Sequence, residues 1–524
     1  LYEEKGVSCL DELDGMFAFA LYDVHRDLLF LARDRLGEKP LHYYHKDGDF
    51  VFASEIKSIL EFPSITPQLN LHSLHRYLTF EYIPAPYSIY QDIHKLEPGQ
   101  YLIFEGNQLT KQSYWRPSYR PPKNPLPVEE VAERLHNHIR CSVEMRTVSD
   151  VPLGAFLSGG IDSSLITAFL VQAASGKRVK TFSIGFDEPS FDESGYAKEV
   201  ASYLGTDHHE ATLTSGEMLA VLPNIVQMLD EPFADASIIP TYLLSRYTRQ
   251  SVTVALSGDG GDELFAGYPT YQAHKVARWI PRWLGSPAHR LAGLLPVSDD
   301  NISFDFKVKR FTAGIAYPMP VRNQVWLGSF DPRQKSQLLS PAVLDALHKP
   351  DEFDVVHQQW DACDSAHYLD RIGFLDLRFY LQDNMLLKVD RASMANSLEV
   401  RVPFLGHHLV DFVCAIPPDL KLRKFITKYI LKQIASDLLP DHIVHRKKKG
   451  FGIPVAKWIK SDLHDLFQET FSIDRIKRGG LFNPHYIQQL LKKHLTNRQD
   501  NRKLLWTLFV FEQWREGNGL SQGL

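Results

Sequence analysis

The sequence is poor in cysteine and contains no long hydrophobic run. Its four cysteines, Cys9, Cys141, Cys363 and Cys414, are far apart in a chain of 524 residues. They form no C-x-x-C pair and are too few to cross-link a secreted protein with disulfides. This favours a reducing, cytoplasmic setting. No apolar run approaches the roughly eighteen residues of a membrane span, and no signal-peptide pattern opens the chain. We therefore expect a cytoplasmic protein with no membrane partner.

An excess of positive charge is also missing. The chain has 58 Lys+Arg against 63 Asp+Glu, for a net charge of -5. This balance offers no overall basic surface for nucleic-acid phosphates, so we expect no nucleic-acid partner. With 44% apolar and 23% charged residues, the composition excludes disordered, collagen-like and coiled-coil proteins. At about 100–200 residues per domain, the length predicts two or three domains.

The local composition of the sequence changes near Arg116. Before it, short aromatic-rich runs bounded by turn residues predict the strands of a sheet sandwich. From Arg116 the sequence reads RPSYRPPKNPLP, whose proline density favours an extended spacer. We predict an N-terminal domain over residues 1–116, a linker over 117–127 and a second domain over 128–524. The strand candidates of the first domain are Met16–Tyr22, Leu28–Ala32, Phe50–Ala53 and Tyr101–Phe104.

The second domain alternates strands, glycine-rich turns and helices, which is typical of a parallel α/β sheet. A helix over 374–397 and a helical last hundred residues complete the pattern. The other predicted elements are strands at Val151–Leu157, Lys180–Phe186 and Ser251–Leu256, a helix at Ser163–Ala174, and a helix capped by Asp192 and ended by Gly205.

The strongest local motif is Ser158-Gly159-Gly160-Ile161-Asp162-Ser163-Ser164, between a predicted strand and a predicted helix. Adjacent glycines let the backbone approach an anion, hydroxyls donate hydrogen bonds, and the helix N-terminus presents free N–H groups. A capped αβ turn is the alternative, but this composition in this context favours a phosphate cradle. Since the chain has no G-x-x-x-x-G-K-[ST] loop, we expect pyrophosphate release rather than cleavage at the γ-phosphate.

A second acidic glycine loop, Ser257-Gly258-Asp259-Gly260-Gly261-Asp262-Glu263, follows the third strand of this domain. Loops at the carboxyl ends of neighbouring parallel strands converge on one crevice, so Asp262 is expected to face Asp162 across a bound nucleotide. Two carboxylates beside a triphosphate indicate Mg²⁺. The alternative is a solvated turn that caps the next helix.

Three further charged segments attract attention. Residues 446–452, RKKKGFG, suit either a solvated face or an ordered loop whose lysine reaches pyrophosphate. Residues 388–391, KVDR, and 398–403, LEVRVP, set charges among apolar residues. Structural ion pairs are the favoured interpretation of most of these charges, with Glu399 as the best candidate for a functional exception.

Together, SGGIDSS, SGDGGDELFAGY, KVDRASMANSLEVRVPFL and RKKKGFGIP resemble class II glutamine amidotransferases of the asparagine synthetase type. GMFAFALYD, LARDRLGEKPLHYY and FASEIKSIL are similar to the later part of that family's N-terminal hydrolase domain. The resemblance covers nearly the whole chain. It implies an N-terminal-nucleophile α+β sandwich domain followed by an α/β, parallel-sheet, adenine-nucleotide α hydrolase-like (PP-loop) synthetase domain.

The resemblance also assigns residues. Asp162 and Asp262 match the metal-binding carboxylates, Lys448 matches the lysine that steadies the adenylation transition state, and Asp259 matches a variable acidic position. We carry Lys448, Asp259 and Glu399 as candidate catalytic residues. The ATP-binding candidates are Leu157, Ser158, Gly159, Gly160, Asp162, Ser163, Ser164, Ile184, Ser257 and Gly258.

The implied reaction activates the aspartate side chain with ATP to an acyl-adenylate and pyrophosphate, after which ammonia displaces AMP. ATP and Mg²⁺ are the implied cofactors. Aspartate, with ammonia or glutamine, is the implied substrate set, and a homodimer is compatible with the family.

The first residues depart from the family pattern. The family's glutaminase nucleophile is an N-terminal cysteine, whereas this chain begins with Leu1; Cys9 matches no nucleophile position and is expected to be a small core residue. We expect that the chain as written does not hydrolyse glutamine, that it derives from a longer protein, and that residues 1–116 are unstable alone.

Other functions stay open. A paralogous amidotransferase acting on a cell-surface polysaccharide, a peptide or an antibiotic precursor shares all these loops, and residues 267–374 would shape its acceptor pocket. A tRNA-modifying PP-loop enzyme is disfavoured by the missing cysteine pairs and the charge of -5. A non-catalytic relative is disfavoured because both loops and Lys448 are present.

Overall fold

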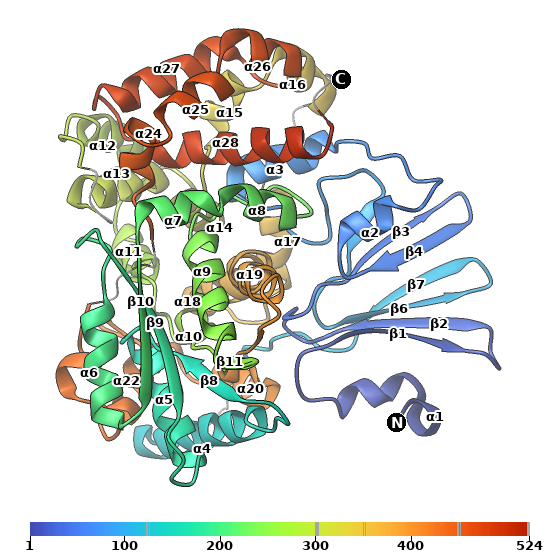
Figure 1. Cartoon of the computed structure of the whole chain (residues 1–524), viewed down its shortest axis with the longest axis vertical. Coiled ribbons are helices and arrows are strands. Elements are labelled where there is room, and N and C mark those ends of the chain that lie inside the picture. The colour runs from blue at the N-terminus through green and yellow to red at the C-terminus, as the bar shows by residue number, and fades with distance from the viewer. Residues whose placement is uncertain are drawn as a thin grey trace.

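The computed structural model describes residues 1–121, 124, 126–298, 303–348, 351, 353–447, 450 and 452–520. Two antiparallel sheets form one side of the molecule, and a parallel sheet with many helices forms the other (Figure 1).

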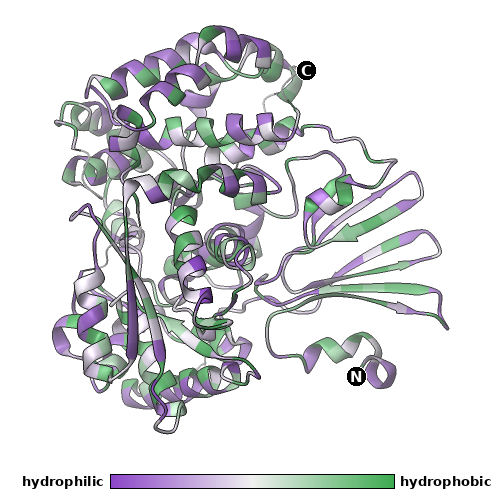
Figure 2. Ribbon diagram, viewed as in Figure 1, coloured by the Kyte–Doolittle hydropathy of each residue, from purple (hydrophilic) through white to green (hydrophobic). Residues whose placement is uncertain are grey.

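The N-terminal sheets have the orders β1-β2-β6-β7 and β4-β3-β5. They pack face to face: Phe50 of one sheet stacks on Phe104 of the other at 4.7 Å between ring centroids. Leu31, Tyr43 and Leu102 lie in the same core. Apolar residues run along these strands (Figure 2). The elements are α1 (Tyr2–Lys5), η1 (Gly6–Asp11), β1 (Ala18–Asp23), β2 (Leu28–Arg33), β3 (His42–Lys46), β4 (Asp49–Ala53), β5 (Ile93–Lys95), β6 (Gln100–Glu105) and β7 (Gln108–Ser113).

The four strands predicted here are confirmed, with ends shifted by up to two residues. Strands β3, β5 and β7 were not predicted. β7, sequence QLTKQS, is almost entirely exposed and therefore has no apolar pattern to reveal it. Cys9 is 4% exposed and packs beneath β2, which confirms its prediction as a core residue.

Helices α2 (Ile56–Leu60) and α3 (Leu71–Phe80) leave the sandwich and join the core of the second half of the chain. The Tyr77 hydroxyl donates to the Thr507 carbonyl at 2.8 Å, and its ring lies 6.0 Å from that of Phe511. Because α3 buries apolar side chains against the C-terminal helix, residues 1–116 alone would expose this apolar surface. This supports the prediction, first made from unpaired strand edges, that residues 1–116 are unstable alone.

The parallel sheet has the order β10-β9-β8-β11-β12, and every neighbouring pair is parallel, as the sequence predicted. Helix α6 begins at Ser194 with Glu193 as its N-cap, not Asp192. Asp192 instead accepts a hydrogen bond from the Ser194 N–H at 3.1 Å, and Gly205 ends the helix in the left-handed conformation. The elements are β8 (Leu153–Phe156), α5 (Ile161–Ala173), β9 (Lys180–Phe186), α6 (Ser194–Leu204), β10 (Asp207–Leu213), α9 (Ile238–Arg249), β11 (Val254–Leu256) and β12 (Glu399–Arg401).

The helix predicted over 374–397 contains a π-helical segment, in which backbone hydrogen bonds connect residues five apart. It comprises α18 (Tyr368–Leu375), η3 (Asp376–Leu386) and α19 (Leu387–Met394). The π-helical segment buries Asp376 and Asp383, and Asp383 accepts a hydrogen bond from the Ala85 N–H at 2.9 Å.

The KVDR segment on α19 joins the two halves of the chain. Lys39 pairs with Asp390 at 2.7 Å, and Arg391 pairs with the buried Asp230 at 2.7 Å while donating to the Ser54 carbonyl at 3.1 Å. The interpretation of these charges as structural ion pairs is confirmed. Buried pairs of this kind are strongly destabilising when one partner is removed.

Further helices surround the parallel sheet and form a lobe above it (Figure 1). None of the helices among the described residues is long and apolar enough to span a membrane. Before η3 they are α4 (Val128–Arg146), α7 (Ser215–Ala220), α8 (Leu222–Met228), α10 (Gly261–Leu264), α11 (Pro269–Ala277), η2 (Arg282–Leu284), α12 (Gly285–Ala292), α13 (Phe304–Ile315), α14 (Met319–Leu327), α15 (Pro332–Leu338), α16 (Pro341–Leu347) and α17 (Asp354–Ala362). After α19 come η4 (Pro403–Leu405), α20 (His407–Ala415), α21 (Pro418–Lys421), the β13 (Leu422–Arg423) and β14 (Ile426–Thr427) hairpin, α22 (Tyr429–Ala435), α23 (Asp441–Val444), α24 (Val455–Lys460), α25 (His464–Thr470), α26 (Ile473–Gly479), α27 (Pro484–Leu495) and α28 (Arg502–Gly517).

Candidate active site

The two glycine loops meet at the point where the strand order of the parallel sheet reverses. Strands β8 and β11 are neighbours, but the chain leaves β8 toward β9 on one side and leaves β11 toward β12 on the other. Ligands of open α/β sheets bind outside the carboxyl ends of the strands at such a switch point. The loops at 157–160 and 257–260 follow these two carboxyl ends.

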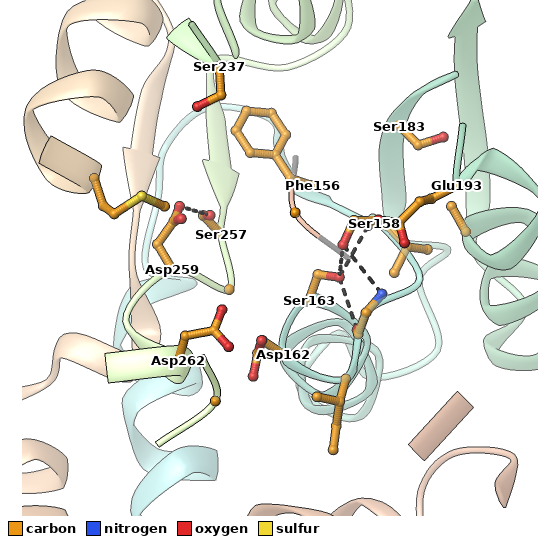
Figure 3. A pocket seen from close by; sticks show the side chains of 18 of the residues that line it. Phe156, Ser158, Asp162, Ser163, Ser183, Glu193, Ser237, Ser257, Asp259 and Asp262 are labelled. Atoms are coloured by element: carbon orange, nitrogen blue, oxygen red, sulfur yellow. Dashed lines mark hydrogen bonds between the residues drawn. The ribbon is translucent and has the colours of Figure 1, made fainter. Parts of the chain in front are cut away.

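A cavity of about 390 Å³ lies between the loops (Figure 3). Strand β9 contributes Phe182, Ile184 and Phe186 to its apolar lining, and the two loops contribute much of its polar lining. Two of the predicted ATP-binding residues, Gly159 and Ser164, do not line the cavity. Gly159 packs against α6, where a Cβ would meet the Tyr196 carbonyl carbon at 2.5 Å, and Ser164 is fully buried. The sequence-predicted residues that line the cavity are Leu157, Ser158, Gly160, Asp162, Ser163, Ile184, Ser257, Gly258, Asp259 and Asp262.

The first loop is a tight turn held by its own hydroxyls. The Ser158 N–H donates to Ser163 Oγ at 3.1 Å, and Ser163 Oγ donates to the Gly160 carbonyl at 3.2 Å. Gly159 has φ 68°, a left-handed conformation that favours glycine, and Gly160 is the N-cap of α5. The arrangement delivers the N-terminus of a thirteen-residue helix to the cavity, the standard geometry for binding an anion.

Asp162 and Asp262 point toward each other from the two loops (Figure 3). The buried ammonium group of Lys428 bridges them: it bonds the Asp162 carboxylate and lies 2.6 Å from Asp262 Oδ1. Lys428 is 3% exposed. A Cβ on Gly267 would come within 2.1 Å of both Asp262 Oδ1 and Lys428 Cε, so only glycine fits beside this cluster.

Lys428 is a residue that sequence reasoning missed. It has φ 54° and lies at the N-cap of α22, in a segment, FITKYIL, with no glycine-rich or acidic pattern. Only the tertiary fold brings this isolated lysine to the two acidic loops.

Glu263 is a buried carboxyl group beside Asp262. The Tyr268 hydroxyl donates to Glu263 Oε1 at 2.6 Å. Burial, followed by repulsion from Asp262, raises the pKa of Glu263 to about 8. Glu263 therefore carries its proton near neutral pH in the folded protein.

This shift predicts a pH dependence of stability. Glu263 has an ordinary pKa of 4.5 and a folded pKa of about 8, so the folded state binds one more proton between these values. Stability should consequently fall as pH rises from about 4.5 to about 8. The variant Glu263→Gln, which cannot ionise, should show a flatter decline. Urea unfolding of both proteins across this range is the measurement, and parallel curves would contradict the assignment.

The basic segment predicted to reach pyrophosphate borders the cavity. Arg446 donates to the Gly159 carbonyl at 2.9 Å, pairs with Glu193, and lies 4.2 Å from the Tyr196 ring centroid. Lys447 and Gly450 line the cavity. Lys448, the predicted catalytic lysine, lies outside the described residues.

A second cationic group of the cavity wall was assigned to a structural role by sequence alone. Lys388 Nζ donates to Ser237 Oγ at 2.8 Å and lies 3.2 Å from Asp235 Oδ2. Burial acts to raise the pKa of Asp235, but the Lys388 charge and hydrogen bonds from Ser237 outweigh it and hold the pKa below its ordinary value. The Asp235 carboxylate is therefore favoured in its charged form and held in a fixed place in the cavity wall.

The structure does not bring Glu399 together with the other candidates. Glu399 is in register with Val254, the first residue of β11, so it lies at the amino edge of the sheet, opposite the loops. It accepts a hydrogen bond from Arg401 at 2.6 Å and does not line the cavity. Glu399 is far from the loops because β12 runs parallel to β11 and begins at Glu399, on the side of the sheet opposite the loops. The charge pattern of LEVRVP does not show the direction of the strand. Asp259, in contrast, lines the cavity and accepts a hydrogen bond from Ser257.

The fold and the site together define a class. The parallel sheet with its glycine-rich, acidic loops at the switch point, without a Walker lysine loop, is the adenine-nucleotide α hydrolase-like fold of PP-loop synthetases. The family model described as asparagine synthase matches residues 134–516, and the glutamine amidotransferase domain model matches residues 1–115. The chain belongs to the asparagine synthase family and is a carbon–nitrogen ligase.

Several named proteins are similar along nearly the whole chain. Asparagine synthetase [glutamine-hydrolyzing] 1 of Bacillus subtilis is 32% identical over 99% of this chain and 79% of that protein. Asparagine synthetase [glutamine-hydrolyzing] 3 of the same organism is 29% identical over 94% of this chain and 78% of that protein. Amidase chyE of Penicillium rubens is 27% identical over 97% of this chain and 80% of that protein.

Proposed function

We propose that the protein converts aspartate to asparagine at the cost of ATP, through an aspartyl-adenylate, with release of AMP and pyrophosphate. The nitrogen comes as ammonia, which glutamine supplies in relatives that hydrolyse it. The observation that carries the proposal is the convergence of two acidic glycine loops on one cavity at the switch point of the sheet.

The chemistry requires activation because oxide is a very poor leaving group from a carboxylate. Attack of the aspartate side chain on the α-phosphate forms a carbon–oxygen–phosphorus link and expels pyrophosphate. The carboxyl group is then a good acyl donor, and ammonia displaces AMP. The N-terminus of α5 and the hydroxyls of Ser158 and Ser163 would hold the phosphates, while the β9 side of the cavity, including Ile184, would take the adenine.

Mg²⁺ fits the donor set that Asp162 and Asp262 offer. Both carboxylates already converge on one cation, the Lys428 ammonium group, and hard oxygen ligands shared with phosphate are what Mg²⁺ prefers. When bound, Mg²⁺ would neutralise charge on the departing pyrophosphate. Asp162 and Asp262 would hold it, and Lys428 would screen the repulsion between the two carboxylates before the nucleotide arrives.

We assign two further basic residues to the phosphates of ATP and a third to the acceptor. Arg446, held against the Gly159 carbonyl, steadies the turn of the phosphate loop, and Lys448 remains the proposed partner of the pyrophosphate. Lys388, which pairs with Asp235 in the cavity wall, is the cation that we assign to an acceptor's carboxylate on the far side of the cavity. Burial of this wall would keep water away from the adenylate.

The testing experiment is pyrophosphate release by the purified protein with MgATP, ammonium and aspartate. We expect release that depends on aspartate and matches asparagine in amount. A reaction without aspartate is the control. Pyrophosphate with no asparagine would show a different acceptor, and ATP binding without release on aspartate would favour the paralogous amidotransferases that act on a polysaccharide, a peptide or an antibiotic precursor.

A further inference from the structure

Large apolar side chains are unusually exposed on the segment that follows α11. Trp279 is 87% exposed, Leu294 82%, Phe304 75%, Trp283 74% and Leu291 68%. We call these five residues the Trp279 surface. Single exposed apolar residues are normal on a soluble protein, but a group of this size within one segment indicates an interaction site.

The packing of α12 accounts for part of this exposure. Gly285 and Ala292 are buried, and a Cβ on Gly285 would meet the Ala316 nitrogen at 2.5 Å, so this side of α12 packs closely on the end of α13. At about 100° per residue, Leu291 lies about 100° around the helix from Ala292, away from the packed side. Trp283 precedes α12, in η2, and Leu294 follows its last residue.

Basic residues predominate in the segment that carries the Trp279 surface. Residues 269–316 contain seven Lys and Arg against three Asp. The exposed basic residues are Arg278, Arg282, Arg290 and Lys307, and Asp305 is buried and bonded to Lys309 at 3.0 Å. The whole chain, by contrast, has a net charge of -5. Helices α12 and α13 form an outer corner of the molecule, away from the N-terminal sheets (Figure 1).

We propose that the Trp279 surface docks the protein onto an anionic membrane surface. Trp279 and Trp283 would insert at the level of the lipid headgroups, where tryptophan is enriched, and Arg290 and Lys307 would face the lipid phosphates. A twofold contact between two copies of this chain would place these basic residues against themselves, which disfavours self-association as the use of the surface.

This docking differs from the expectation that the protein has no membrane partner. The absence of an apolar span and of a signal-peptide pattern led to that expectation, and neither detects a local basic and aromatic corner. Helix α11 connects the corner to the cavity, because it begins directly after the cavity residues Gly267 and Tyr268. Nine residues at about 1.5 Å each place the two about 14 Å apart along the helix.

The test is flotation of the full chain with lipid vesicles, either phosphatidylcholine alone or mixed with phosphatidylglycerol. We expect recovery with the anionic vesicles that falls at high salt. The double variant Trp279→Ser/Trp283→Ser should bind about tenfold more weakly, because it loses buried apolar area. The variant Arg290→Gln/Lys307→Gln should weaken binding and reduce its salt dependence.

Val24→Ser/Val148→Ser is the matched control, since these side chains are 75% and 77% exposed elsewhere on the surface. It should bind like the parent, and thermal unfolding should show that all variants fold. Equal recovery on neutral and anionic vesicles, or no recovery at all, would overturn the proposal. A dimer in sedimentation velocity that Trp279→Ser/Trp283→Ser abolishes would overturn it in favour of self-association.

Discussion

Replacing Asp262 with asparagine is expected to lower pyrophosphate release by about a hundredfold or more, a loss typical of removing one group that stabilises transition-state charge. Asp262 faces Asp162 and is one of the two carboxylates that we propose as Mg²⁺ ligands. Its replacement by an isosteric amide keeps the shape of the loop but halves the negative charge offered to the metal. The measurement is the rate of pyrophosphate release at increasing Mg²⁺ concentration.

Glu399→Gln is the matched control for this experiment. Both changes convert a carboxylate to its amide, but Asp262 lies in α10, just after the carboxyl end of β11, whereas Glu399 lies at the amino edge of the sheet and pairs with Arg401. We expect its rate to stay within about twofold of the parent, since surface ion pairs contribute little. A severe loss in Glu399→Gln together with a mild one in Asp262→Asn would reverse the assignment of the site to the carboxyl ends of the strands.

Replacing Lys428 with methionine is expected to affect both stability and metal binding. Lys428 is buried between Asp162 and Asp262, so its removal leaves two uncompensated carboxylates and should cost about 3–5 kcal/mol of unfolding free energy. Mg²⁺ should restore part of that loss by taking the place of the ammonium group. The midpoint of thermal unfolding should therefore rise more steeply with Mg²⁺ in Lys428→Met than in the parent.

Lys432→Met is the control for a lysine on the same helix. Lys432 lines the cavity, and burial, followed by repulsion from Lys428, lowers its pKa. Its removal leaves the Lys428 bridge in place, so we expect no added response to Mg²⁺. A response to Mg²⁺ in Lys428→Met no greater than in the parent would show that the ammonium group does not occupy the metal position.

Local patterns predicted the parts of the site that lie within single loops. SGGIDSS and SGDGGDE each combine glycine, hydroxyl and carboxylate within a few residues, and parallel strand order alone then implies that they meet. The parallel sheet was predictable for the same reason: buried strands bounded by glycine are continuous apolar runs. These features depend on short-range sequence.

Features that depend on tertiary contact could not be predicted. Lys428 becomes part of the site only because α22 begins beside two loops formed far earlier in the chain. Glu399 has a suggestive charge pattern, but its place depends on the direction in which β12 joins the sheet. Strand β7 is polar at nearly every residue, so no apolar pattern in the sequence predicts that it is a strand or that it pairs with β6.

The π-helical segment η3 sets the rotation of α19 relative to both the cavity and the contact between the two halves of the chain. Lys388, in the cavity wall, and Arg391, which donates to the Ser54 carbonyl of the N-terminal half, both follow it on α19. Deleting one residue between 376 and 386 would replace π-helical turns with ordinary α-helical turns, which changes both the length and the rotation of the helix ahead of α19. Lys388 and Arg391 would then leave their partners at the same time. This stretch should therefore tolerate substitutions on its surface far better than any change in length.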